Sequence, residues 1–277
     1  MRRRQRICRR EVSEDGAVRH RPTAADALLD QSHALDAWLQ ALPADAYGRP
    51  SVLDGWDVRL LVAHLLLIER GLVRVLKQPS REKPLAPYAF VARYRPSAEA
   101  IATSTHDTAA EHTGPELTAQ FGTSLDVVAA TLADAYPAVV QAPRGPLRAE
   151  DWIETRIVEL VVHTDDLNRT FPELEPIPLV RSALGRTARC LAGMLADAYP
   201  GRSVEVRIPP YAAVQCGVGD PGPTHTRGTP PNVVETDALT FLRLATGRTA
   251  WTDALASGAV HASGLRADLS DVLPLLS

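Results

Sequence analysis

A carboxylate and an imidazole stand four residues apart in an otherwise aliphatic run. Residues 157–163 read IVELVVH, and Glu159 and His163 are the two polar members. Positions i and i+4 of a helix share a face, so a helix here would direct both side chains to one spot. Such a pair can fill two coordination positions of a Zn²⁺-like ion. The spacing alone is weak evidence, because the same pair could lie on a solvated helix surface.

A third candidate ligand, His64, interrupts the apolar stretch LLVAHLLLI at residues 60–68. A single histidine in such a stripe is more often a satisfied core residue than a ligand. If the inward faces of two helices meet, however, His64 joins Glu159 and His163 in a set of two histidines and one carboxylate. Three protein ligands and one open position are typical of a catalytic metal site. Asp166 could accept the other ring N–H of His163, or it could belong to an exposed helix end.

Amphipathic patterns place these candidates on helices in the first half of the chain. Thr23 with Asp26 predicts a capping box, and Asp57 predicts the N-cap of the helix that carries His64. Four prolines between residues 77 and 96 indicate mainly loop, followed by a weaker helix. We expect the long helices over residues 24–42, 57–77, 113–140 and 148–168. Four long helices with one longer crossover predict a four-helix bundle.

The composition changes after residue 170, where FPELEPIP holds three prolines in eight residues. The predicted fold class is a mixed two-domain chain of the α + α/β type. Its predicted parts are a disordered basic tail at 1–20, a helix bundle at 21–170, a linker at 171–177 and a small α+β domain at 178–277. In that last domain we expect strands near 203–208, 212–218, 232–236 and 259–264, and helices near 178–198, 237–247, 251–258 and from about 270.

Composition bounds the possible functions. The net charge of −3 and the pI of about 6.2 argue against a nucleic-acid binder. The longest nearly apolar stretch is residues 60–68, whereas a membrane-spanning helix needs about 20 residues, so no membrane insertion is expected. The 3 cysteines form no C-x-x-C motif, which fits a reducing cytoplasm. Lys77 and Lys83 are the only lysines among 30 basic residues, a bias typical of GC-rich bacteria such as actinobacteria.

Three segments resemble the mycothiol-dependent maleylpyruvate isomerase family. DGWDVRLLVAHLLLIE (54–69) resembles the signature that opens the second helix of that family, and RIVELVVHTDDLNR (156–169) resembles its second metal-binding helix. The segments DALTFLRLATGR and ALASGAVHASG are similar to its C-terminal domain, which resembles sterol-carrier-protein folds. Order and spacing agree over roughly 20–277. The resemblance implies a DinB-like metal-binding helix bundle followed by a sterol-carrier-like α+β domain.

The resemblance also implies a chemistry. Carried over residue by residue, it makes His64, Glu159 and His163 the ligands of a divalent metal, with zinc as the expected ion and mycothiol as the cosubstrate. A metal lowers the pKa of a thiol and supplies a thiolate at neutral pH. That thiolate can add to an activated double bond, allow rotation and leave, or it can be transferred to an electrophile. The expected partners are therefore a small-molecule substrate and a thiol.

A C-terminal arginine that faces the bundle is the last feature that the resemblance implies. Such an arginine could bind a carboxylate with its two-pronged guanidinium group. Arg248 is the candidate, with Arg243 behind it, although either could be an ordinary solvated arginine. No motif identifies substrate residues, and we do not expect maleylpyruvate itself to be the physiological substrate.

Two other functions remain open at this point. The C-terminal domain could bind an apolar ligand, with the bundle as a non-catalytic scaffold. Alternatively, the basic arm, with 6 arginines in the first ten residues, could bind an acidic partner.

Overall fold

The computed structural model describes residues 22–94, 97–219 and 230–276. The basic tail expected at 1–20 lies outside the described residues, as does most of the Gly/Pro/Thr-rich loop at 219–231.

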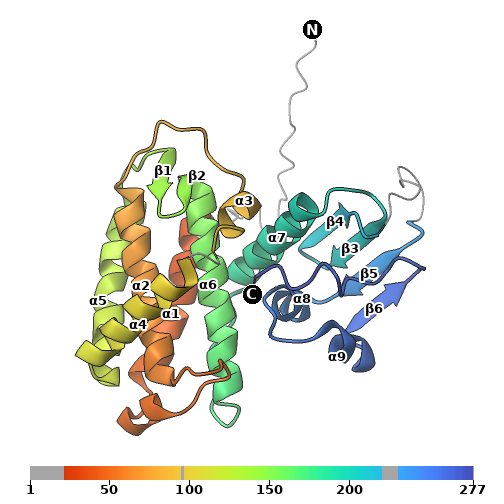
Figure 1. The fold of residues 1–277 in the computed structure, drawn as a ribbon. Helices are drawn as coiled ribbons and strands as arrows, with labels where there is room; N and C mark the ends of the chain where they lie inside the picture. Colours follow the sequence, from red (N-terminus) through yellow and green to blue (C-terminus); the bar gives the residue numbers. More distant parts are fainter. Residues whose placement is uncertain (1–21, 95–96, 220–229, 277) are drawn as a thin grey trace, which may run out of the picture.

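Four long helices form a bundle in the first half of the chain (Figure 1). They are α1 (Ala24–Gln40), α2 (Val58–Leu76), α5 (Gly114–Ala133) and α6 (Ala149–Thr170). Helices α1 and α2 each pack against both α5 and α6. A short 3-10 helix, η1 (Ala44–Gly48), precedes α2, and α4 (Ala98–Glu111) packs on α2. The arrangement confirms the predicted four-helix bundle.

Side-chain caps are present at three helix starts, the first two of them as predicted. The Thr23 side chain and Asp26 form the capping box of α1. The Asp57 carboxylate accepts a hydrogen bond from the Leu60 backbone N–H at 2.8 Å. Thr113 and Glu116 form a second capping box at the start of α5. Each cap satisfies backbone N–H groups that the first helical turn leaves without partners.

The helix predicted to reach Val140 was wrong in its second part. Helix α5 ends at Ala133, and residues 139–142 form strand β1 (Val139–Ala142), which pairs antiparallel with β2 (Gly145–Arg148). Pro137 explains the early end, because proline lacks the N–H that a helix needs and disfavours helical geometry in the preceding residue. The predicted loop before Pro96 also contains one short helix, α3 (Pro87–Val91).

The second half consists of a four-stranded sheet with helices beside it (Figure 1). The strands are β3 (Val204–Ile208), β4 (Ala212–Cys216), β5 (Val233–Thr236) and β6 (Val260–Ser263), in the order β4-β3-β5-β6. Strands β3 and β5 are parallel, and the other pairs are antiparallel. The helices are α7 (Arg181–Ala198), α8 (Ala238–Ala245) and α9 (Trp251–Ala256). Together the two halves confirm the predicted mixed architecture.

The helix expected from about residue 270 is absent from the described residues 270–276, which form turns and irregular chain. Pro274 removes a backbone donor in the middle of this short segment, so no helical turn could extend through it. Instead, the backbone N–H groups of Leu275 and Leu276 donate to the carbonyl oxygen of Ala245 at 2.8 and 3.0 Å. The chain end therefore closes against the end of α8.

Helix α7 joins the two halves. It packs against α1 and α6 of the bundle on one side and against α8 and β4 on the other. Figure 1 shows α6 as the bundle helix beside α7. In the described ranges, no helix combines the length and the apolar character that a membrane crossing would need.

Candidate metal centre

Three side chains from two helices converge between α2 and α6. His64 comes from α2, and Glu159 and His163 come from α6. Their candidate ligand atoms all lie within 4.8 Å of one another. Nε2 of His64 lies 3.7 Å from Oε2 of Glu159, and Nε2 of His163 lies 3.5 Å from the same oxygen. Each imidazole ring thus directs its Nε2 toward the carboxylate of Glu159.

This donor set fits a divalent ion of the zinc type. Two imidazole nitrogens and one carboxylate oxygen are ligands that Zn²⁺ takes in catalytic sites, with one position left open. Donor atoms bound tetrahedrally at about 2.0–2.1 Å from the ion lie about 3.4 Å from one another. The separations of 3.5 and 3.7 Å are close to that spacing and long for hydrogen bonds.

The two histidines differ in how their second ring nitrogen is held. Nδ1 of His163 lies 3.0 Å from Oδ2 of Asp166, whose side chain is fully buried. Because this carboxylate accepts the Nδ1–H, the lone pair of His163 remains on Nε2, facing Glu159. Nδ1 of His64 is buried and has no hydrogen-bond partner among the described residues. The indole of Trp56 lies against this ring edge-on, with centroids 5.5 Å apart.

Neighbouring groups keep the Glu159 carboxylate charged. Burial lowers the pKa of His64, which therefore stays neutral at neutral pH. Burial alone would raise the pKa of Glu159, but His163, His64 and Arg156 together hold this pKa well below its usual range. For His163, burial acts to lower the pKa, but the carboxylates of Asp166 and Glu159 outweigh it and raise the pKa. A proton therefore competes for His163 in the metal-free site.

Two arginines of the second half reach α6 next to these ligands. Arg248 donates from Nε and Nη2 to the two carboxylate oxygens of Asp166, at 3.2 and 2.9 Å. Arg243 donates in the same way to Asp165, at 2.8 and 2.6 Å. Both guanidinium groups thus hold protein carboxylates with two hydrogen bonds each, where the sequence suggested a substrate carboxylate. Hydrogen bonds link Arg248 to Asp166 and Asp166 to His163.

The family model described as mycothiol maleylpyruvate isomerase N-terminal domain matches residues 28–168 of the sequence. The chain belongs to this family. The model described as bacterial SCP ortholog matches residues 180–275, in line with the sterol-carrier resemblance of the second half. No curated protein sequence matches the chain.

Solved structures of the mycothiol-dependent maleylpyruvate isomerase share the fold of this family member. One is 17% identical, with a TM-score of 0.57, and the alignment covers 87% of this chain and 91% of that chain. Another is a histidine-to-alanine mutant, 18% identical, with the same TM-score and coverage. At this identity the likeness establishes the common fold across both halves.

Two arginines that interact with Glu159, Arg156 and Arg144, were not predicted from the sequence. Arg156 precedes Glu159 by three residues on α6, and its Nη2 lies 3.7 Å from Oε1 of Glu159. Helical i, i+3 spacing is a signal that could have identified it. Arg144, in the turn of the β1–β2 hairpin, interacts electrostatically with both Arg156 and Glu159. No sequence signal indicated Arg144, because the hairpin itself was not predicted.

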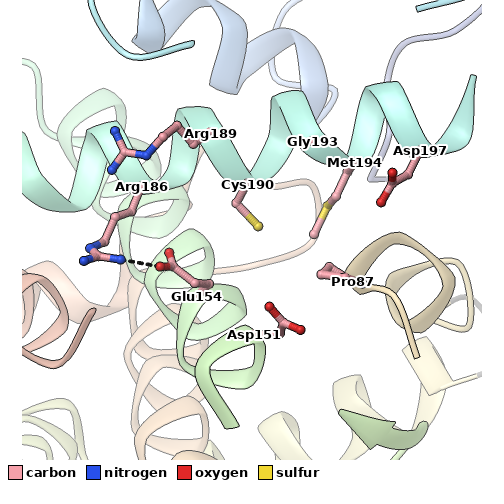
Figure 2. A pocket seen from close by; sticks show the side chains of 9 residues that line it. All are labelled: Pro87, Asp151, Glu154, Arg186, Arg189, Cys190, Gly193, Met194 and Asp197. Carbon is pink, nitrogen blue, oxygen red and sulfur yellow. Dashed lines mark hydrogen bonds and ion pairs between the residues drawn. The ribbon is translucent and has the colours of Figure 1, made fainter. Parts of the chain in front are cut away.

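A separate cavity of about 290 Å³ lies between α3, α6 and α7 (Figure 2). It is lined by charged residues, including the ion pair of Arg186 with Glu154, and by Cys190. Burial, with Glu154 and Asp151 nearby, raises the pKa of Cys190 to about 12, so its thiol stays protonated and is a poor nucleophile. None of the three converging residues lines this cavity.

Proposed function

We propose that this chain is a divalent-metal-dependent enzyme that uses a low-molecular-weight thiol, mycothiol, on a small electrophilic substrate. The reaction is either cis–trans isomerisation or thiol addition or transfer. The observation that carries the proposal is the convergence of His64, Glu159 and His163 in a chain of the mycothiol maleylpyruvate isomerase family.

Nε2 of His64, Nε2 of His163 and a carboxylate oxygen of Glu159 would hold the ion, with Zn²⁺ as the preferred candidate. A bound divalent ion lowers the pKa of a thiol and so makes thiolate available at neutral pH. Access for a thiol and a substrate fits the 27% exposure of the Glu159 side chain, whereas both histidines are buried. The aliphatic residues next to the ligands on α6, which include Val158 and Val162, are buried.

The thiol chemistry then has two outcomes. A mycothiol thiolate that adds to an activated carbon–carbon double bond turns it into a single bond. Rotation about that bond and expulsion of the thiolate regenerate the double bond as the other isomer. With an electrophile that carries a leaving group, the same attack forms a carbon–sulfur bond and releases that group, which makes the enzyme an S-transferase.

The remaining residues act on the ligands. Asp166 accepts the Nδ1–H of His163 and so fixes the ring and the tautomer. Arg248 holds Asp166 through its two hydrogen bonds and is therefore proposed as a positioning residue. Arg243 is proposed to hold the second half of the chain against α6 through Asp165.

The test is an assay over a panel of small electrophiles that follows both mycothiol consumption, for transfer, and mycothiol-dependent cis–trans isomerisation, with zinc content measured on the same preparations. Wild-type protein should carry metal and, with at least one electrophile, either consume mycothiol or isomerise the substrate only when mycothiol is present. Glu159→Gln, which keeps the shape of the side chain but removes its charge, should lose both the bound metal and the mycothiol-dependent activity. An active wild type that holds no metal would contradict the metal-dependent proposal, and metal-loaded protein with neither mycothiol consumption nor mycothiol-dependent isomerisation would contradict the thiol-dependent one.

A second candidate function is binding of an apolar ligand by the C-terminal region, without catalysis. The match of residues 180–275 to the bacterial SCP ortholog family favours it. Native mass spectrometry of the purified chain should then detect a co-purified lipid. A lipid-bound protein without thiol-dependent activity would favour this candidate over the first.

A further inference from the structure

Two arginines near the converging ligands have no role in the proposal above. Arg144 lies in the β1–β2 turn, and Arg156 lies on α6, one turn before Glu159. Nε of Arg144 is buried and has no hydrogen-bond partner among the described residues. Arg156 is 9% exposed, and its polar contacts are a 3.3 Å hydrogen bond from Nε to Thr155 and the 3.7 Å approach to Glu159.

An aromatic scaffold holds both guanidinium groups in place. Cζ of Arg144 lies 4.4 Å from the ring centroid of Phe90, and Cζ of Arg156 lies 4.2 Å from that of Trp152. Phe90 and Trp152 contact each other edge-on, with centroids 6.0 Å apart. The ring centroid of Tyr94 also lies 5.2 Å from Cζ of Arg144. Stacking on aromatic faces fixes a guanidinium group without using its N–H donors, so the donors that make no other contact stay available to a ligand.

The charges around this scaffold do not balance. Arg243 and Arg248 each have their own aspartate, whereas in the described part of the chain Arg144 and Arg156 share the field of one carboxylate, Glu159. If Glu159 also neutralises a metal ion, neither arginine keeps a counter-charge. Unpaired charge at a mostly buried position is costly, and an arginine remains protonated even where burial lowers its pKa. With or without a metal ion, the arrangement therefore lacks at least one negative group.

We infer that Arg144 and Arg156 form an anion-binding subsite beside the three converging ligands, and that it binds a carboxylate group of the small molecule that reacts there. A carboxylate suits the site because guanidinium groups bind its two oxygens as a fork. The inference rests on the proposed function for the reacting molecule, but the subsite itself needs neither thiol nor metal. It makes Arg144 and Arg156 determinants of specificity for carboxylate-bearing electrophiles over neutral ones.

Binding of succinate, an unreactive dicarboxylate, tests the subsite directly. Titration calorimetry at fixed ionic strength would compare wild type with Arg144→Met and Arg156→Lys. The first variant removes the charge, and the second keeps the charge but loses the fork. We expect each of these two variants to bind succinate at least about tenfold more weakly than wild type, as for the loss of a hydrogen bond to a charged group. Arg148→Met removes an exposed charge from the same hairpin and should bind succinate like wild type.

Circular dichroism would show which variants keep the fold, and Arg144→Met is decisive if Arg156→Lys does not fold. Unchanged succinate binding in folded Arg144→Met would overturn the inference, and so would an equal loss in Arg148→Met. Tighter binding of inorganic phosphate than of succinate, lost in the same variants, would overturn the carboxylate assignment. Succinate binding involves no turnover. A protein that binds succinate but has no mycothiol-dependent activity would therefore contradict the proposed function and still support the subsite.

Discussion

Arg248 and His163 bind the same atom, Oδ2 of Asp166, at 2.9 and 3.0 Å. The arginine follows α8 in the second half of the chain, and the histidine is a proposed metal ligand on α6. One buried carboxylate therefore connects the sheet region to the candidate metal centre. The position of His163 should depend on a residue 85 positions further along the chain.

Replacing Arg248 should weaken metal binding without removing any ligand. In Arg248→Met, Asp166 loses two hydrogen bonds and no longer holds His163 as firmly, so zinc affinity should fall about tenfold or more. Competition with a chromogenic chelator measures this affinity. Arg169→Met is the matched control, because Arg169 approaches Asp166 only to 3.9 Å. Wild-type affinity in Arg248→Met would contradict the positioning role.

The pair of Arg243 and Asp165 should stabilise the contact between the two halves. A double-mutant cycle with Arg243→Met and Asp165→Asn should give a coupling energy of about 1 kcal/mol, toward the low end for a two-pronged pair because water screens the partly exposed arginine. Chemical denaturation provides the free energies of unfolding. Zinc affinity should change little in this cycle, in contrast to Arg248→Met. A coupling energy near zero would mean that the pair does not contribute to stability.

Glu69 should make the protein less stable as pH rises. Its carboxyl group is buried, and burial raises its pKa to about 9, although the nearby hydroxyls of Ser124 and Ser32 act to lower it. The folded state then binds a proton that the unfolded state has released above pH 4.5, so stability falls between about pH 4.5 and 9. Glu69→Gln should remove this penalty, a gain of about 3 kcal/mol at pH 7.

Denaturation of the Glu69→Gln variant at several pH values checks this prediction. The gain over wild type should grow from pH 5 to pH 8. The exposed Glu150→Gln serves as the control and should show no such growth. A constant difference between Glu69→Gln and wild type would show that Glu69 ionises normally.

Metal affinity should rise with pH beyond the ordinary histidine range. Asp166 and Glu159 raise the pKa of His163 above 6.5 in the metal-free protein, so a proton must leave this ring before an ion binds. Apparent zinc affinity should therefore keep rising above pH 6.5. In Asp166→Asn the same rise in zinc affinity should move to lower pH, because the variant lacks the carboxylate that contributes most to raising the pKa of His163. Identical pH profiles for the two proteins would contradict this account.

Local signals in the sequence predicted the helices and the strands of the second half well. Thr23 and Asp57 each cap a helix where predicted, because capping depends on residues only a few positions apart. The β1–β2 hairpin was missed, since its short strands follow directly on a strongly helical pattern that Pro137 interrupts. The C-terminal helix was wrong because the segment instead pairs with Ala245, a contact set by the fold.

The candidate site was only partly readable from the sequence. The spacing of Glu159 and His163 made them neighbours on any helix, but their meeting with His64 depends on how α2 and α6 pack. The partners of Arg243 and Arg248 lie about 80 positions away in sequence, at 78 and 82 residues. Such pairs form only when the two halves dock, and no local pattern encodes them.

Zinc binding by the full chain is the measurement that tests the central claim most directly. Competition titration should find about one Zn²⁺ per wild-type chain, as expected for a single three-ligand site. His64→Ala, Glu159→Gln and His163→Ala should each bind zinc at least about a hundredfold more weakly, while folding like the wild type. A wild-type chain that binds no zinc, or three variants that bind it as tightly as wild type, would contradict the proposed metal centre.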